Sequence, residues 1–252
     1  MKHTIRLALC LLLLTTSALP GMSQTSPTTV PADGRFRAGE LLYADDFKEG
    51  LAQWRVEMEK PGTVSAKDGV LDIDVPAGVT VWFRHELDGP VMISYEVTVI
   101  SAGGPNDRVS DLNCFWMATD PAAPGDIFAH PRSGAFAGYN SLHTYYVGLG
   151  GNGDKTTRFR RYIGDEVERP LLPENDLSAA DHPDKMIVAN KSQIVRLISD
   201  GELIQYYRDN ERIFEFIDPQ PYLKGWFAIR TTKNHMQVRN LRITRLIPTP
   251  SR

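Results

Sequence analysis

The sequence predicts an all-β protein built as a sandwich of two sheets. Three observations lead to this expectation. Apolar and polar residues alternate with a period of two over runs of roughly four to eight residues, which is typical of strands with one buried face. Turn-forming pairs such as Asp200-Gly201 and Asp209-Asn210 separate these runs at short intervals. No long segment has the 3.6-residue apolar period of a helix, so a layered β architecture is expected.

The expected strands follow one another closely along the chain. The clearest is 91–100, where Val91 and Ile93 share one face while Ser94 and Glu96 share the other. A loop rich in Pro, Ala and Gly is expected from 119 to 135, and another at 170–191 with one helical turn near 177–181. The other expected strands outside the central hairpin are 41–47, 70–75, 79–84, 112–118, 192–199, 202–208, 212–217, 225–231 and 235–246.

A β-hairpin is expected around the glycine-rich run 148–154, which lies between two arms rich in aromatic and β-branched residues. A turn centred on Gly151 and Asn152 would place Tyr145 opposite Arg158 and His143 opposite Arg160. Directly paired residues have Cβ atoms about 4.5–5.5 Å apart. One face of the hairpin would then carry an imidazole, a phenol and two guanidiniums, which is costly to bury alone and well suited to an anionic ligand.

The start of the chain is expected to be a secretory signal peptide. Lys2 and Arg6 precede the apolar run 7–14, and small residues including Ser23 follow, as in such peptides. We therefore expect a signal peptide at 1–23, a flexible leader at 24–39 and one β-sandwich domain at 40–248. The expected location is periplasmic or secreted. Cys114 is the only cysteine after residue 23, so no internal disulfide is expected.

The composition argues against several classes of function. The formal net charge of −3 at pH 7 provides no basic field for nucleic acid. The apolar run 7–14 is too short to span a bilayer, so no membrane partner is expected after cleavage. No His and Cys spacing indicates zinc. Asp72 and Asp74 share a face but are expected to be solvated, leaving no carboxyl pair for a glycosidase. No cofactor is expected, with a structural Ca²⁺ at Asp45 and Asp46 left open.

Several residues are candidates for chemistry. His143 is the leading one, because imidazole transfers protons near neutral pH; the alternative is a structural histidine. Tyr145 is the second, with packing in the sheet as its alternative. Arg158 and Arg160 are expected to bind the ligand unless they lie on a solvated face or pair with acids of the following loop. Further ligand contacts are expected from Arg84, Asn113 and Asn140. Trp116 and the thiol of Cys114 are expected in the core, although the face of Trp116 is left open.

The last strands resemble the meander of concanavalin A-like jelly rolls. The resemblance is carried by 194–214 with its two turns, by Gly225-Trp-Phe-Ala-Ile-Arg and by Val238-Arg-Asn-Leu-Arg-Ile. It covers nearly the whole mature chain and implies a concanavalin A-like β-sandwich, or jelly roll. The stretches Tyr145-Tyr-Val-Gly-Leu-Gly-Gly-Asn, Thr157-Arg-Phe-Arg-Arg-Tyr and 225–236 resemble a bacterial domain family of unknown function. That family is similar to YesU-type proteins of pectin-utilisation loci and to keto-disaccharide hydrolase-like jelly rolls, which implies a glycan context.

A partial resemblance concerns the jelly-roll polysaccharide lyases. Arg84-His-Glu-Leu resembles their Arg-x-Glu-Leu strand, and Ser141-Leu-His143 resembles their Gln-Ile-His strand. Serine replaces the glutamine, which removes an amide that binds carboxylate. Asn140 or Asn113 is the candidate substitute.

These observations lead to an expected function with two alternatives. The preferred one is a polysaccharide lyase that cleaves uronic-acid-containing glycans by β-elimination. Arginine and amide groups would neutralise the uronate carboxylate, His143 or Tyr145 would remove the adjacent proton, and a tyrosine would protonate the leaving oxygen. The alternatives are a non-catalytic glycan-binding module and a hydrolase or eliminase of oxidised disaccharides. In each case the expected partner is an oligo- or polysaccharide, acidic in the preferred case.

Overall fold

The computed structural model describes residues 34–249 of the 252-residue chain. The expected signal peptide and most of the expected leader lie outside this range. Within it the protein is a sandwich of two antiparallel sheets, and the only α-helix of the described residues is the four-residue α1 (Gly151–Asp154). The predicted all-β architecture with little helix is therefore confirmed.

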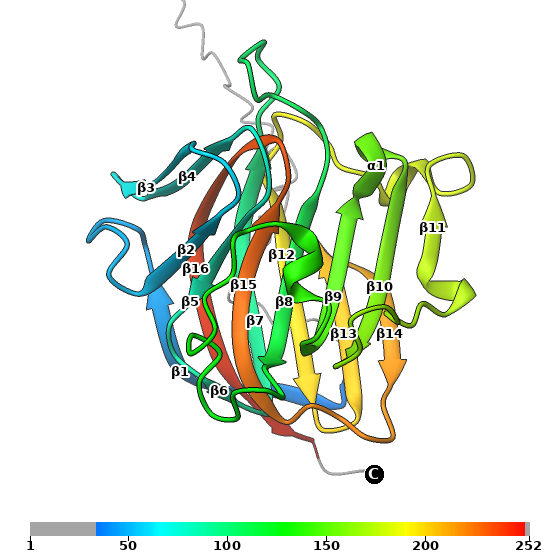
Figure 1. Cartoon of the computed structure of the whole chain (residues 1–252). Coiled ribbons are helices and arrows are strands. Elements are labelled where there is room, and N and C mark those ends of the chain that lie inside the picture. The colour runs from blue at the N-terminus through cyan, green and yellow to red at the C-terminus, as the bar shows by residue number, and fades with distance from the viewer. Residues whose placement is uncertain (1–33, 250–252) are drawn as a thin grey trace, which may run out of the picture.

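Sheet A has the order β14-β13-β12-β7-β16-β4-β3, and β1 also pairs with β16. Figure 1 shows it behind the second sheet, with the long red strand β16 running through its middle. Its strands are β1 (Phe36–Asp45), β3 (Thr63–Lys67), β4 (Val70–Val75), β7 (Val91–Val99), β12 (Gln193–Asp200), β13 (Leu203–Arg208), β14 (Glu211–Ile217) and β16 (Asn234–Pro248).

Sheet B has the order β11-β10-β9-β8-β15-β5-β2, and β6 pairs with β15. Its strands are β2 (Trp54–Met58), β5 (Val79–Phe83), β6 (Leu87–Asp88), β8 (Leu112–Thr119), β9 (His143–Gly150), β10 (Thr156–Ile163), β11 (Asp176–Ser178) and β15 (Lys224–Thr231). The remaining elements are short 3₁₀ helices, namely η1 (Phe136–Tyr139), η2 (Pro173–Asn175) and η3 (Pro183–Lys185).

The main core lies between the two sheets. Residues of alternating position point inward from both, such as Ile93 and Val195 from sheet A and Trp116 and Val147 from sheet B. Because Trp116 is 1% exposed, its expected place in the core is confirmed. Cys114 is fully buried beside it, and burial raises the pKa of its thiol to about 12. A thiol held protonated in this way is unreactive.

A second aromatic cluster covers the outer face of sheet B. Trp82, Phe115 and Tyr146 come from the strands, and Tyr139 comes from η1, which lies across them. The indole of Trp82 and the hydroxyl of Tyr139 both donate to Glu57 Oε2, each at 2.9 Å. The centre of this outer face is therefore filled by the segment 120–142, which Figure 1 shows in green in front of β5, β15 and β8.

The structure departs from the expected elements in three places. β1 begins at Phe36, earlier than the expected strand 41–47, and the side chain of Phe36 packs against the outer face of sheet A. The helical turn expected near 177–181 is present at 178–182, where the main-chain nitrogen of His182 donates to the carbonyl of Ser178 at 2.8 Å, but β11 pairs with β10 just before it and was not expected. The short strands β2, β3 and β6 were also not expected, although β2 and β3 alternate between apolar and polar residues.

Candidate functional site

The hairpin of β9 and β10 has a different register from the expected one. Tyr145 lies opposite Arg161, three positions beyond the expected Arg158, and Arg158 lies opposite Gly148. The connecting turn is longer than a two-residue turn, and Asn152 and Gly153 within it have left-handed backbone angles. Since an odd shift sends side chains to the other face of a sheet, the expected convergence of His143 and Tyr145 with Arg158 and Arg160 is wrong.

Tyr145 points into the main core. Its hydroxyl donates to Asp218 Oδ2 at 2.7 Å and accepts from the main-chain nitrogen of Tyr222 at 3.0 Å. Arg161 Nε donates to the same carboxylate at 2.7 Å. Burial raises the pKa of Tyr145 far above its usual range. The phenol therefore stays protonated and ties the segment after β14 to sheet B, which is a structural task.

His143 belongs to the same structural arrangement. Its ring stacks on that of Tyr222, with centroids 5.4 Å apart and planes within 8°. Its Nε2 lies 3.2 Å from the carbonyl oxygen of Ile163. Both contacts are with the protein itself, which matches the structural alternative for this histidine.

The opposite face of the hairpin continues two rows of side chains across sheet B. The rows follow the pairing of neighbouring strands, so each residue lies beside the next. One row consists of Thr80, Arg230, Asn113, Gly148, Arg158 and Asp176. The second consists of Trp82, Ala228, Phe115, Tyr146 and Arg160.

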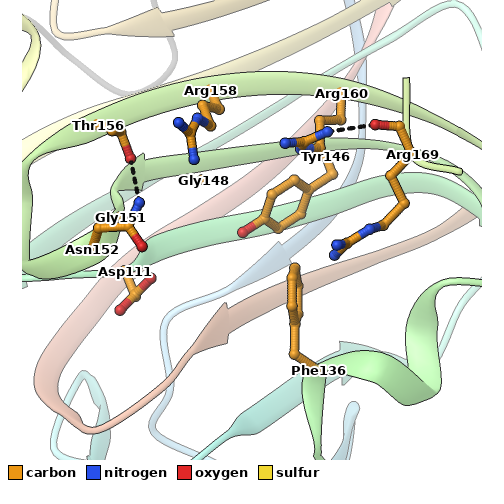
Figure 2. A pocket seen from close by; sticks show the side chains of 10 residues that line it. All are labelled: Asp111, Phe136, Tyr146, Gly148, Gly151, Asn152, Thr156, Arg158, Arg160 and Arg169. Carbon is orange, nitrogen blue, oxygen red and sulfur yellow. Dashed lines mark hydrogen bonds between the residues drawn. The ribbon is translucent and has the colours of Figure 1, made fainter. Parts of the chain in front are cut away.

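A pocket of about 260 Å³ opens where these rows reach β9 and β10. Gly148 forms part of its floor, and an added Cβ there would lie 2.7 Å from the hydroxyl of Tyr146. Because Gly148 has no side chain, the phenol of Tyr146 can lie over the strand at this position. Figure 2 shows the lining side chains around this space: Asp111, Phe136, Tyr146, Gly151, Asn152, Thr156, Arg158, Arg160 and Arg169.

The three arginines of the pocket differ in their partners. Arg158 forms a two-pronged ion pair with Asp176, with Nε–Oδ1 at 2.7 Å and Nη2–Oδ2 at 3.2 Å. Arg160 instead donates from Nη1 to the main-chain carbonyl of Arg169 at 2.5 Å. Among residues 34–249, no carboxylate lies within ion-pair distance of Arg160 or Arg169. This wall therefore has an unbalanced positive charge, and partial burial, with the nearby charges of Arg169 and Arg158, lowers the pKa of Arg160.

The hydroxyl of Tyr146 lies over Gly148 and points along the pocket floor. Burial raises the pKa of this phenol well above its usual value, so it is a hydrogen-bond donor at neutral pH. The ring of Phe136 stands beside it and carries the guanidinium of Arg169 at 5.3 Å from its centroid. Aromatic faces with polar edges are the groups that commonly contact sugar rings.

The end of the pocket farthest from Arg169 carries the carboxylate of Asp111, which pairs with Arg108 at 3.6 Å. Asp111 Oδ2 accepts from the hydroxyls of Ser110 and Thr232, each at 2.6 Å. Its Oδ1 has only the amide of Asn113 at 3.5 Å. This oxygen therefore has room for another donor. Figure 2 shows Asp111 beside Asn152 at one end and Arg169 at the other.

The other residues expected to bind ligand lie outside the pocket lining. Arg84 is exposed beyond β5 and donates to the carbonyl of Trp54 at 2.9 Å. Asn140 follows η1 and donates to the carbonyl of Glu166 at 2.8 Å. Asn113 is buried beside Gly148 under the pocket, and its amide oxygen has no hydrogen-bond partner. Of the predicted contacts, only Arg158 and Arg160 line the pocket.

The pocket residues missed by the sequence analysis come mostly from outside the hairpin. Tyr146 and Asn152 lay within it, and the correct turn length would have paired Tyr146 with Arg160. Asp111, Phe136 and Arg169 reach the pocket from three separate segments. No local pattern marks such residues, because only the tertiary fold brings them together.

Residues 34–249 contain no group of three or more His, Cys, Asp or Glu side chains arranged to hold a metal ion. Asp45, considered for a structural Ca²⁺, accepts hydrogen bonds from the main chain of Phe47 and from the side chains of Gln53 and Trp54. The carboxylate oxygens of Asp45 are thus engaged in hydrogen bonds that hold the chain in place after β1. No helix in the described range is long and apolar enough to cross a membrane.

Comparison with protein families gives a match to the model described as Domain of unknown function (DUF6250), over residues 73–241. The chain belongs to this family. The matched range runs from β4 to β16, so it includes all the residues that line the pocket. No curated protein matches the chain.

Solved structures show that the fold is that of the jelly rolls. A protein of unknown function with a galectin-like fold from Bacillus subtilis has a TM-score of 0.66 at 18% identity, covering 85% of this chain and all of its own. The endo-β-1,3-glucanase from Pyrococcus furiosus has a TM-score of 0.55 at 11% identity, covering 89% and 100%. The β-agarase B from Zobellia galactanivorans has a TM-score of 0.54 at 11% identity, covering 88% and 98%. The expected concanavalin A-like β-sandwich is therefore confirmed.

Proposed function

We propose that this protein binds an acidic saccharide in the pocket above β9 and β10 and does not cleave it. The observation that carries the proposal is the pair Arg160 and Arg169, whose guanidiniums share one pocket wall without a carboxylate partner in the described chain. Guanidinium bound to a ligand carboxylate is a strong, directional contact. The rings of Tyr146 and Phe136 supply the aromatic surface for a sugar.

The side chains of the pocket favour binding over catalysis. Hydrolysis of a glycosidic bond requires two positioned carboxyl groups, and Asp111 is the only acidic residue among the lining residues. β-Elimination requires a base. That base must lie beside C5, the carbon that carries the uronate carboxylate. The lining contains no histidine among the described residues, and Asp111 lies at the end away from Arg169.

Two similarities to other proteins support a saccharide ligand. The fold is shared with proteins named as an endo-β-1,3-glucanase and a β-agarase. The resemblance to YesU-type and keto-disaccharide hydrolase-like proteins points to the same glycan context. We include in the proposal that the protein is exported and meets its ligand in the periplasm or outside the cell, as the order of residues 1–23 indicates.

The proposal is tested with a panel of acidic and neutral oligosaccharides, measured by calorimetry and by product analysis. Acidic ligands are expected to bind, and Arg160→Gln to weaken them. Arg84→Gln is the matched control, because Arg84 is an exposed arginine outside the pocket. An unsaturated uronate product, seen by its ultraviolet absorbance, would favour the polysaccharide lyase instead. New reducing ends without that absorbance would favour a hydrolase of glycans or oxidised disaccharides.

A further inference from the structure

The two ends of the pocket offer different groups to a ligand. Arg160 and Arg169 form the basic end, whereas the other end carries the amide of Asn152 and the carboxylate of Asp111, whose Oδ2 lies 3.6 Å from Nη1 of Arg108. The hydroxyl of Tyr146 lies between them. A ligand that fits must therefore present an anion at one end and hydrogen-bond donors at the other.

The space between these ends suits one sugar ring. Its volume of about 260 Å³ lies just below the range of roughly 300–1,000 Å³ that is usual for drug-sized ligands. In a hexuronate ring the carboxylate is attached at C5, and the hydroxyl groups at C2 and C3 lie on the far side of the ring. A single hexuronate therefore has an anion and hydrogen-bond donors on opposite sides of one ring.

The segment around η1 occupies the outer face of sheet B on one side of the pocket, where a bound polysaccharide would otherwise continue. Phe136 and Tyr139 of η1 stand on the outer face next to the pocket, and Tyr139 packs on the rings of Trp82 and Phe115. The buried pair of Arg132 with Asp120, at 2.6 Å, holds this segment in place. On the other side, the turn at Gly151 and Asn152 and the segment of Arg169 form walls of the pocket. A sugar chain that ran from the pocket across β8, β15 and β5 would therefore meet the segment of Tyr139.

We propose that the ligand is one hexuronate residue at the end of a saccharide chain, with its carboxylate between Arg160 and Arg169 and its ring hydroxyls donating to Asp111. The proposal rests on the proposed function and adds the ligand class, its orientation and its position in the chain. Asp111 then selects sugars with hydroxyl groups opposite the carboxylate. Its free oxygen Oδ1 is the acceptor for them, since Oδ2 is already engaged by Ser110 and Thr232.

Calorimetric titration of the protein with small probes tests each part. The probes are methyl glycosides of glucuronate and galacturonate, the C6 methyl esters of both, the corresponding neutral hexosides, and oligouronates of increasing length. At least one uronate is expected to bind, and esterification to weaken it roughly ten- to a hundredfold, because a charge-assisted contact is lost. The affinity for an oligouronate, expressed per saccharide molecule, is expected to stay constant as the saccharide lengthens, because each molecule has one suitable end.

Two variants test the carboxylate contact and the hydroxyl contact separately. Arg160→Gln is expected to weaken the uronate but not its ester. Asp111→Asn is expected to weaken both by roughly three- to tenfold, because a neutral acceptor replaces a charged one. Asparagine tolerates the left-handed backbone of residue 111, where φ is 57°. Arg84→Gln is the control for both.

The possible outcomes are distinguishable. The proposal of a terminal hexuronate is wrong if neutral hexosides and esters bind as tightly as uronates. It is also wrong if the affinity per saccharide molecule rises in proportion to its length. In both cases the proposed saccharide binding would still stand. Unchanged binding in Asp111→Asn overturns the proposed orientation. If no saccharide of either panel binds, the proposed function and this inference both fail.

Discussion

Arg160 donates a hydrogen bond from Nη1 to the main-chain carbonyl of Arg169 at 2.5 Å. The two residues lie on β10 and on the segment that follows it, and this contact holds their guanidiniums on one wall of the pocket. Like charges repel, so holding two guanidiniums on one wall costs free energy. An acidic ligand would relieve that repulsion.

Asp176→Asn is expected to strengthen the binding of acidic ligands by a few fold. Asp176 neutralises Arg158 through a two-pronged ion pair, so its replacement leaves a third arginine free to face the ligand. The gain should shrink at high salt, since exposed charges are screened. Titration of the variant at two salt concentrations measures it. Weaker binding of an acidic ligand would mean that the pair is needed to shape the pocket.

Gly148→Ala is expected to impair ligand binding more than folding. The new methyl group would lie 2.7 Å from the Tyr146 hydroxyl. It would therefore push the phenol away from its position on the pocket floor. Binding affinity and melting temperature measured on the same preparation separate the two effects. Gly138→Ala is a matched control, because the nearest atom there is 4.0 Å away. Equal affinity in Gly148→Ala and the wild type would exclude Tyr146 from ligand contact.

Tyr145→Phe is expected to destabilise the protein by about 1–3 kcal/mol, since the buried carboxylate of Asp218 loses a hydrogen-bond donor. Saccharide binding by the folded variant should be unchanged, because Tyr145 lies on the opposite face of sheet B from the pocket. Denaturant unfolding and calorimetry provide the two measurements. Loss of affinity at unchanged stability would restore Tyr145 as a candidate site residue.

The pH dependence of stability should include a contribution from His235. Its Nδ1 lies 3.1 Å from Asp107 and its Nε2 3.2 Å from Asp72, and Asp74 lies nearby, so hydrogen bonds and charge raise the pKa of the imidazole. A raised pKa in the folded state stabilises the protein below the unfolded pKa of about 6.5. This stabilisation is lost as pH rises through the folded-state pKa.

Unfolding free energies measured across this pH range test the contribution. The fall in stability with rising pH should be smaller in His235→Gln than in the wild type, because glutamine does not titrate. The segment at 102–107 is also expected to exchange its amide hydrogens faster above the transition, since Asp107 accepts from the main chain of Ala102 and Gly104. Identical pH profiles for the two proteins would refute this role of His235.

Export is expected to remove residues 1–23 or nearly so. The basic, apolar and small-residue order of this stretch is that of a secretory signal. N-terminal sequencing of protein recovered from outside the cytoplasm checks it, and an intact Met1 there would contradict the prediction.

The sequence by itself determined the class of fold. Strand periodicity is local, so segments such as β4, β7 and β8 were visible from their alternating residues. The core position of Cys114 followed from the same pattern. The resemblance of the closing strands to jelly rolls then placed these strands in a known architecture.

Only the tertiary structure decided where the site is. The positions of Arg158 and Arg160 were foreseen, but the face they occupy depends on the turn between β9 and β10. Four left-handed residues there, from Gly150 to Asp154, lengthen the turn and shift the register by an odd number of positions. Arg169 reaches the pocket from a segment without local periodicity. Strand patterns state which residues share a face, whereas turn geometry and long-range packing decide which faces meet.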